Sequence, residues 1–175
     1  MLITRSLFGV YFYVISKAYK GVTVVILDAS VDYASRMRHL MDKLGIRVLD
    51  WWISGRGWEK KWNNLKPDFS IVDNQMPHRD GLRIVQRMRA YKPEALIMFT
   101  HSYQGLIANA IEFNALKAGA ATAMEKPFSD EQFLLRVENI LSLFPPRKRL
   151  QMKKSMSHEE IQAMKSVSDK RETKS

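Results

Sequence analysis

The strongest constraint on the fold is the repeated alternation of short apolar runs with helix-like segments between residues 22 and 144. The first run, "VTVVIL", is almost continuously apolar and rich in β-branched residues, which is typical of a strand buried on both faces. Because a segment long enough for a crossover helix follows each run, we predict a parallel sheet with helices on both faces. The expected strands are 22–27, 46–52, 69–73, 95–100 and 121–125.

The segments that follow the strands carry the period of amphipathic helices. In the first of them Ala34, Met37 and Leu40 share one helical face, and Gly45 provides a stop signal. The expected helices are 32–44, 58–65, 80–90, 106–118 and 130–144. Five strand–helix units favour a doubly wound α/β fold with strand order 2-1-3-4-5.

Charge and cysteine content bound the organisation of the chain. The 175 residues include no cysteine and carry a net charge of +10. The missing cysteines exclude disulfide scaffolds, thiol catalysis and thiolate metal sites. Most of the excess positive charge lies at the two ends, so we expect three parts: an apolar N-terminal extension over 1–21, a domain over 22–144 and a basic tail over 145–175.

The two ends allow several interpretations. Residues 7–16 form an uncharged apolar run that is too short to span a bilayer, which needs about 20 residues. A docking segment and a start site placed too far upstream are both favoured over a signal peptide.

The tail is expected to be partly disordered, with a short helix over about 158–167, and DNA binding is not favoured. We expect a cytoplasmic protein with no membrane span.

Four chemically useful side chains fall where expected strands end: Asp28, Asp73, Thr100 and Lys126. In a doubly wound sheet, sites form beyond the carboxyl ends of the strands, so these side chains should converge. One carboxylate could act as a nucleophile towards phosphorus, while a lysine and a hydroxyl take phosphoryl oxygens. The alternative is that each residue only caps a turn, but four such residues at one edge favour phosphoryl chemistry.

From about residue 22 to residue 144 the chain resembles the receiver domain of bacterial two-component response regulators. The resemblance rests on Asp28 after "VVIL", on "DNQMPHRDG" beginning at Asp73, on Thr100 and on "EKPF", which contains Lys126. The string from Asp73 to Gly81 is the specific part, and the other residues follow in the order of the family.

The resemblance implies a role for each of these residues. Asp73 would be the phosphoacceptor, Thr100 would bind the phosphoryl group, and Lys126 would pair with its charged oxygens. Mg²⁺ would be held by Asp28, by Asp73 and by the backbone carbonyl of Gln75. The family also implies a cis peptide bond before Pro127.

Three departures from the family pattern qualify these roles. Ala29 stands where receivers usually have a second acid, so the metal site is expected to be weakened. Ala123 replaces the aromatic residue that usually swings with the threonine, and Tyr103 is a candidate to take over part of that role. The segment between Thr100 and Gly119 is about one helical turn longer than usual, which suggests a reshaped loop around Gly105.

Two functions remain open on these grounds. The favoured one is a single-domain response regulator, phosphorylated by a sensor histidine kinase or a phosphotransfer protein, that signals through a changed protein-interaction surface. It would be no enzyme beyond its own phosphorylation and dephosphorylation, and a homodimer is compatible with it. The alternative is a receiver-like interaction module that works without phosphate.

Histidines and tryptophans have more ordinary interpretations. The four histidines show no metal-ligand spacing, and His78 and His101 are expected in solvated loops near the acidic edge. Trp58 and Trp62 lie four residues apart on one expected helix, so core packing is favoured over a ligand site.

Overall fold

The computed structural model describes residues 19–145, in which five strands alternate with five helices. The strands are β1 (Thr23–Leu27), β2 (Arg47–Trp52), β3 (Phe69–Asp73), β4 (Leu96–His101) and β5 (Thr122–Glu125). The helices are α2 (Val31–Lys43), α3 (Trp58–Leu65), α4 (Gly81–Tyr91), α5 (Gly105–Ala118) and α6 (Asp130–Ser142). The expected elements are all present, with ends shifted by at most two residues.

All five strands are parallel and lie in the order β2-β1-β3-β4-β5, which confirms the doubly wound α/β fold. The order reverses direction between β1 and β3, which are direct neighbours. In the register of β3 with β4, Asp73 lies opposite Thr100. The carboxyl ends of the central strands therefore meet at one edge of the sheet.

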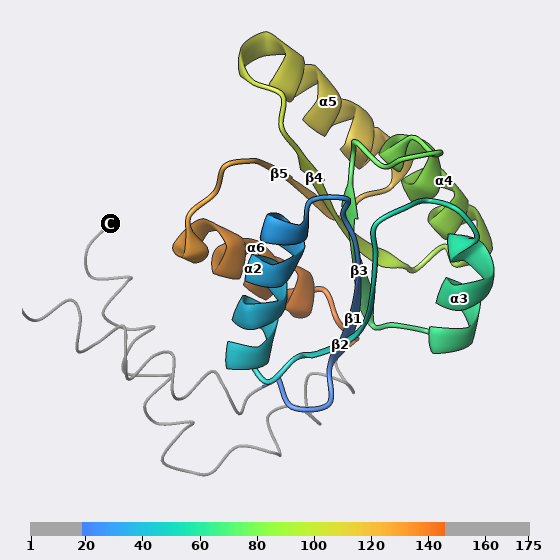
Figure 1. Cartoon of the computed structure of the whole chain (residues 1–175), viewed down its shortest axis with the longest axis vertical. Helices are drawn as coiled ribbons and strands as arrows, with labels where there is room; N and C mark the ends of the chain where they lie inside the picture. Colours follow the sequence, from blue (N-terminus) through green and yellow to red (C-terminus); the bar gives the residue numbers. More distant parts are fainter. Residues whose placement is uncertain (1–18, 146–175) are drawn as a thin grey trace, which may run out of the picture.

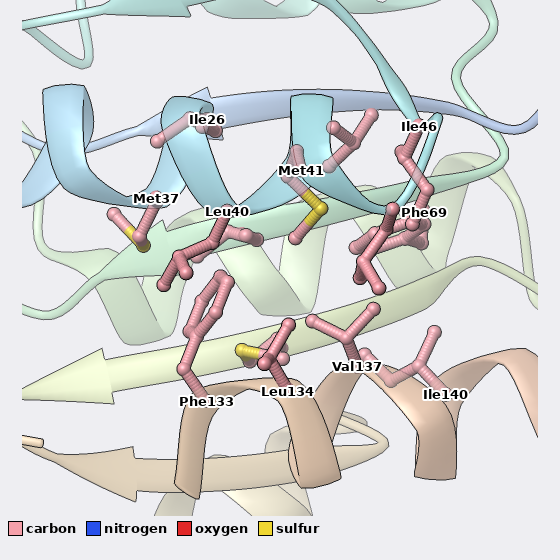
Figure 2. Packing of buried hydrophobic residues seen from close by; sticks show 14 of the residues in the cluster. Ile26, Met37, Leu40, Met41, Ile46, Phe69, Phe133, Leu134, Val137 and Ile140 are labelled. Carbon is pink, nitrogen blue, oxygen red and sulfur yellow. The ribbon is translucent and has the colours of Figure 1, made fainter. Parts of the chain in front are cut away.

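Helices cover both faces of the sheet (Figure 1): α2 and α6 on one, and α3, α4 and α5 on the other. On the first face, Met37 and Leu40 of α2 and Phe133 and Val137 of α6 belong to one cluster, which also includes Ile26 of β1 (Figure 2). This packing has the aliphatic and aromatic composition of an ordinary core, so it supports the sheet without contributing polar chemistry.

The second face contains the tryptophans. The rings of Trp58 and Trp62 in α3 lie 6.1 Å apart in an edge-on arrangement, and both are buried. The indole Nε1 of Trp62 donates to Ser70 Oγ at 2.9 Å, which satisfies its polar atom inside the core. The expectation that these two residues pack in the core is confirmed.

One expectation about the chain after Thr100 is wrong. Gly105 is the first residue of α5, with φ of 60°, and only residues 102–104 separate this helix from β4. The segment therefore lengthens a helix and does not form a longer loop. Figure 1 shows the N-terminal part of α5 extending past the carboxyl edge of the sheet.

The expected apolar run over 7–16 and the expected tail helix over 158–167 both lie outside the described residues. Within residues 19–145, no helix has the length and apolar character needed to cross a membrane.

Candidate functional site

The four strand-end side chains predicted from the sequence meet in one cluster. The ammonium Nζ of Lys126 lies 2.6 Å from Asp28 Oδ2 and 2.7 Å from Asp73 Oδ1, so it bridges the two carboxylates. The hydroxyl of Thr100 donates to the same Asp73 Oδ1 at 3.2 Å. A lysine and a hydroxyl therefore already point at one oxygen of the central carboxylate.

The loop after β3 fixes the second oxygen of Asp73. The backbone N–H of Gln75 donates to Asp73 Oδ2 at 3.0 Å. The residue between them, Asn74, donates its own N–H to the carbonyl of Thr100 and accepts from Gly81 N at 3.1 Å. These backbone bonds hold the carboxylate of Asp73 in one orientation at the end of its strand.

Asp28 is held from both sides. Its Oδ1 accepts the backbone N–H of Ser30 at 2.9 Å, and its backbone carbonyl accepts the indole N–H of Trp51 at 2.7 Å. Ser30 is also the N-cap residue of α2, where its hydroxyl accepts from Tyr33 N. The carboxylate is thus built into the turn that joins β1 to α2.

All four residues are buried, none being more than 6% exposed. Burial raises the pKa of Asp28 above its ordinary value of 3.8, because removal from water penalises the charged form. The charge and hydrogen bond of Lys126 act in the opposite direction, and the charge of Asp73 adds to the rise. Two carboxylates share one ammonium, so the cluster favours a further positive charge.

The raised pKa of Asp28 predicts a specific dependence of stability on pH. A raised folded-state pKa means that the protonated acid is favoured in the folded protein. Its contribution to stability is fully present below the ordinary value of 3.8 and is lost as the pH rises above it. Asparagine mimics the protonated acid, so Asp28→Asn should become progressively more stable than the natural protein between about pH 4 and pH 7.

Urea unfolding of both proteins across that pH range measures the effect. Asp32→Asn, which removes an exposed acid in the first turn of α2, is the matched control for the loss of one carboxylate near the start of this helix. A free-energy difference between Asp28→Asn and the natural protein that shrinks with rising pH would contradict the expectation.

The oxygens at this edge fit Mg²⁺ with a reduced set of donors. Asp28 and Asp73 bring carboxylate oxygens together there, and such oxygens are the hard ligands that this ion prefers. Ala29 offers none, and nowhere in residues 19–145 do three or more acidic, histidine or cysteine side chains gather as metal ligands. A bound ion would therefore keep more of its coordination as water or substrate oxygen.

Sequence reasoning missed Tyr33, which lies against the cluster. Lys126 Nζ sits 4.6 Å from the centre of the Tyr33 ring, and that ring contacts Phe128 at 5.4 Å. The aromatic face stabilises the ammonium by a cation–π interaction. Tyr33 comes five residues after Asp28, in the first turn of α2. This closeness in sequence to a site residue was the only indication that its ring lies near Lys126.

The expectation for His101 is also wrong. It is the last residue of β4, and its side chain is fully buried, with Nε2 lying 3.2 Å from Glu112 Oε1 on α5. His78, by contrast, is an exposed turn residue with φ of 66°, as expected. The peptide bond between Lys126 and Pro127 is cis, as the resemblance implied.

The fold and the cluster define a doubly wound α/β protein with a lysine-bridged acidic site at the carboxyl edge of its sheet. The chain belongs to the response regulator receiver domain family, whose family model matches residues 24–138.

Similar proteins include the chemotaxis protein CheY of Thermotoga maritima, which is 32% identical over 108 residues. That match covers 62% of this chain and 88% of CheY. A protein-glutamate methylesterase/protein-glutamine glutaminase of Vibrio parahaemolyticus is 30% identical over 112 residues, or 63% of this chain, but the match spans only 30% of that enzyme. The match to the methylesterase therefore concerns one part of a longer protein.

Among solved structures, CheY in the CheX-CheY-BeF3-Mg²⁺ complex of Borrelia burgdorferi is similar with a TM-score of 0.64 and 21% identity. The similarity covers 70% of this chain and 90% of that one. The receiver domain of Thermotoga maritima CheB has a TM-score of 0.62 at 22% identity. At these identities the structures support the fold alone.

Proposed function

We propose that this protein is a phosphorylatable receiver that accepts a phosphoryl group on Asp73 in a two-component phosphorelay. The observation that carries the proposal is the convergence of Lys126 Nζ and Thr100 Oγ1 on Asp73 Oδ1, at 2.7 and 3.2 Å. Two donors placed around one carboxylate oxygen can follow the phosphoryl oxygens as they arrive.

The reaction is a transfer between two nucleophiles. One carboxylate oxygen of Asp73 attacks phosphorus, and an acyl phosphate bond forms while the bond from phosphorus to the donor breaks. The leaving group departs with the electron pair of that bond: from phosphohistidine it is the imidazole, which takes up a proton, and from acetyl phosphate it is the acetate anion. The ammonium of Lys126 and the hydroxyl of Thr100 then stabilise the charge on the phosphoryl oxygens.

Asp28, Asp73 and the carbonyl of Gln75 would hold Mg²⁺, which when bound supplies positive charge at the phosphoryl oxygens. With Ala29 in place of a second acid, affinity for the ion should be lower than in a site with three carboxylates. The ammonium of Lys126 already bridges both remaining carboxylates, which partly offsets their charge.

The proposed donor is a sensor histidine kinase or a phosphotransfer protein, and the output is a changed surface for a downstream protein. The relatives are consistent with protein partners, since the similar CheY from Borrelia burgdorferi was solved in complex with CheX. We propose a cytoplasmic regulator that acts through binding and not as an enzyme on other molecules.

Mass spectrometry after incubation with acetyl phosphate and graded Mg²⁺ tests the proposal. We expect an adduct of one phosphoryl group on Asp73, absent from Asp73→Asn, that requires high Mg²⁺. Ala29→Asp restores a carboxylate beside Asp28, so it should lower the Mg²⁺ concentration for half-maximal adduct by about tenfold or more.

A different result would favour the alternative, a receiver-like interaction module that works without phosphate. That result is no adduct on the natural chain at any Mg²⁺ concentration, together with a clear adduct on Ala29→Asp. It would show that Asp73, Thr100 and Lys126 can support phosphorylation and that Ala29 prevents it in the natural chain.

A further inference from the structure

His101 occupies a position that the proposed phosphorylation reaction does not use. It directly follows Thr100 in β4, and its side chain is fully buried on the side of the sheet that α5 covers. Its ring centre lies 6.5 Å from that of Phe99 and 6.4 Å from that of Tyr103, with the Tyr103 ring nearly parallel. A polar ring with no exposure at this place requires an explanation.

Two hydrogen bonds connect His101 to other elements. Its Nε2 lies 3.2 Å from Glu112 Oε1, within hydrogen-bond distance. Its backbone carbonyl accepts the N–H of Lys126 at 2.7 Å. His101 therefore links β4 to Lys126 through its backbone and to helix α5 through its side chain.

The other ring nitrogen of His101 has no such contact. Nδ1 of His101 is buried and has no hydrogen-bond partner among the described residues. A buried polar atom without a partner costs free energy, so a shift of the ring that gave Nδ1 a partner would recover that cost.

Helix α5 buries mainly small side chains. Its fully buried residues are the small Ala108 and Ala115, while Leu106 is 87% and Phe113 66% exposed. No side chain caps its first turn at Gln104. The contact between His101 and Glu112 therefore adds a specific polar link between β4 and a helix that otherwise packs mainly through small side chains.

We propose that His101 is the positioning residue that transmits the state of Thr100 to α5 through Glu112. When Thr100 moves towards a phosphoryl group, His101 shifts with it, and Glu112 follows or is released. The neighbouring strand has only Ala123 at the place where receivers usually carry an aromatic, so it offers no ring for this task.

The displacement would reach the surface. Glu112 lines a groove between α5 and α6, together with Met124, Leu135 and Arg136. Moving its carboxylate changes the charge in that groove. The inference rests on the proposed function, because phosphorylation of Asp73 is the natural signal that would move Thr100.

The first test does not need phosphate. Thr100→Val removes the hydroxyl that donates to Asp73, at nearly constant side-chain volume. Hydrogen exchange of peptides covering residues 105–118 is then measured in the full chain. We expect exchange in α5 to change about threefold or more. His101→Phe keeps a ring but loses the contact with Glu112. In that background, Thr100→Val should change the exchange of α5 by less than about 1.5-fold. An α5 that ignores Thr100→Val in the presence of His101 overturns the inference.

The second test uses acetyl phosphate, with the adduct on Asp73 and the exchange of α5 measured on the same sample. Glu112→Met, which has no carboxylate or amide oxygen to contact His101, should be phosphorylated as fully as the natural chain but lose most of the α5 response, whereas Glu131→Met, an exposed change on α6, should keep it. A full response in Glu112→Met overturns the inference, even if His101→Phe fails to fold. If no adduct forms at all, the proposed function fails, and the Thr100→Val comparison alone decides the role of His101.

Discussion

Replacing Lys126 by methionine should lower the free energy of unfolding by about 3 to 5 kcal/mol at neutral pH. The ammonium is 3% exposed and lies within hydrogen-bond distance of both Asp28 and Asp73. Without it, two carboxylates remain buried side by side with no cation, and each raises the free energy of ionising the other. The loss should shrink towards acidic pH, where the acids take up protons.

Urea unfolding at neutral and acidic pH measures this loss. Lys117→Met removes an exposed lysine from α5 and should cost less than about 0.5 kcal/mol, as is usual for surface substitutions. Adding Asp28→Asn to Lys126→Met removes one of the two buried carboxylates that have lost their cation. The double variant should recover a large part of the free energy of unfolding that Lys126→Met loses. Lys126→Met with near-natural stability at neutral pH would show that the cluster is solvated and not held by the bridging ammonium.

The location of the site was predictable because strand order and strand ends are both encoded in simple patterns. Continuous apolar runs marked the buried strands, and the doubly wound order made β1 and β3 neighbours. Asp28 and Asp73 could therefore be paired across the sheet from sequence alone. Thr100 and Lys126 followed because they lie where the next two strands were expected to end.

The surroundings of the site were not predictable, because they depend on which face each side chain points to. We expected β4 to end at Thr100, but it continues through His101. Side chains alternate along a strand, so this one added residue places His101 on the same face as Phe99, under α5. A loop position would have left the ring in solvent.

Tyr33 was missed for a similar reason. In sequence it is one of several residues in the first turns of a helix, and only the packing of α2 and Phe128 brings its ring over Lys126. Long-range contacts of this kind have no local periodicity. The residues that modify the site are thus harder to find than those that form it.

Replacing Gly81 by alanine should destabilise the protein by about 4 kcal/mol, which is a large effect for the addition of one methyl group. A Cβ at this first residue of α4 would overlap the backbone carbonyl oxygen of Asp73 and lie 2.7 Å from Asn74 Cα. Both neighbours are backbone atoms, so no side chain can rotate away. Relief requires moving α4 or the end of β3, and the second movement displaces the proposed phosphoacceptor.

Gly57→Ala separates this steric effect from backbone strain. Gly57 has a left-handed φ of 67°, but a Cβ there meets nothing within 4 Å, so its replacement should cost only about 1 kcal/mol. Urea unfolding compares the two variants, and phosphorylation by acetyl phosphate is measured at low temperature, where both remain folded. Gly81→Ala should also form less adduct than Gly57→Ala, because the hydrogen bond from Gly81 N to Asn74 O holds the loop that orients Asp73. Equal losses in the two variants would mean that α4 adjusts freely and that its close approach to β3 does not fix the site.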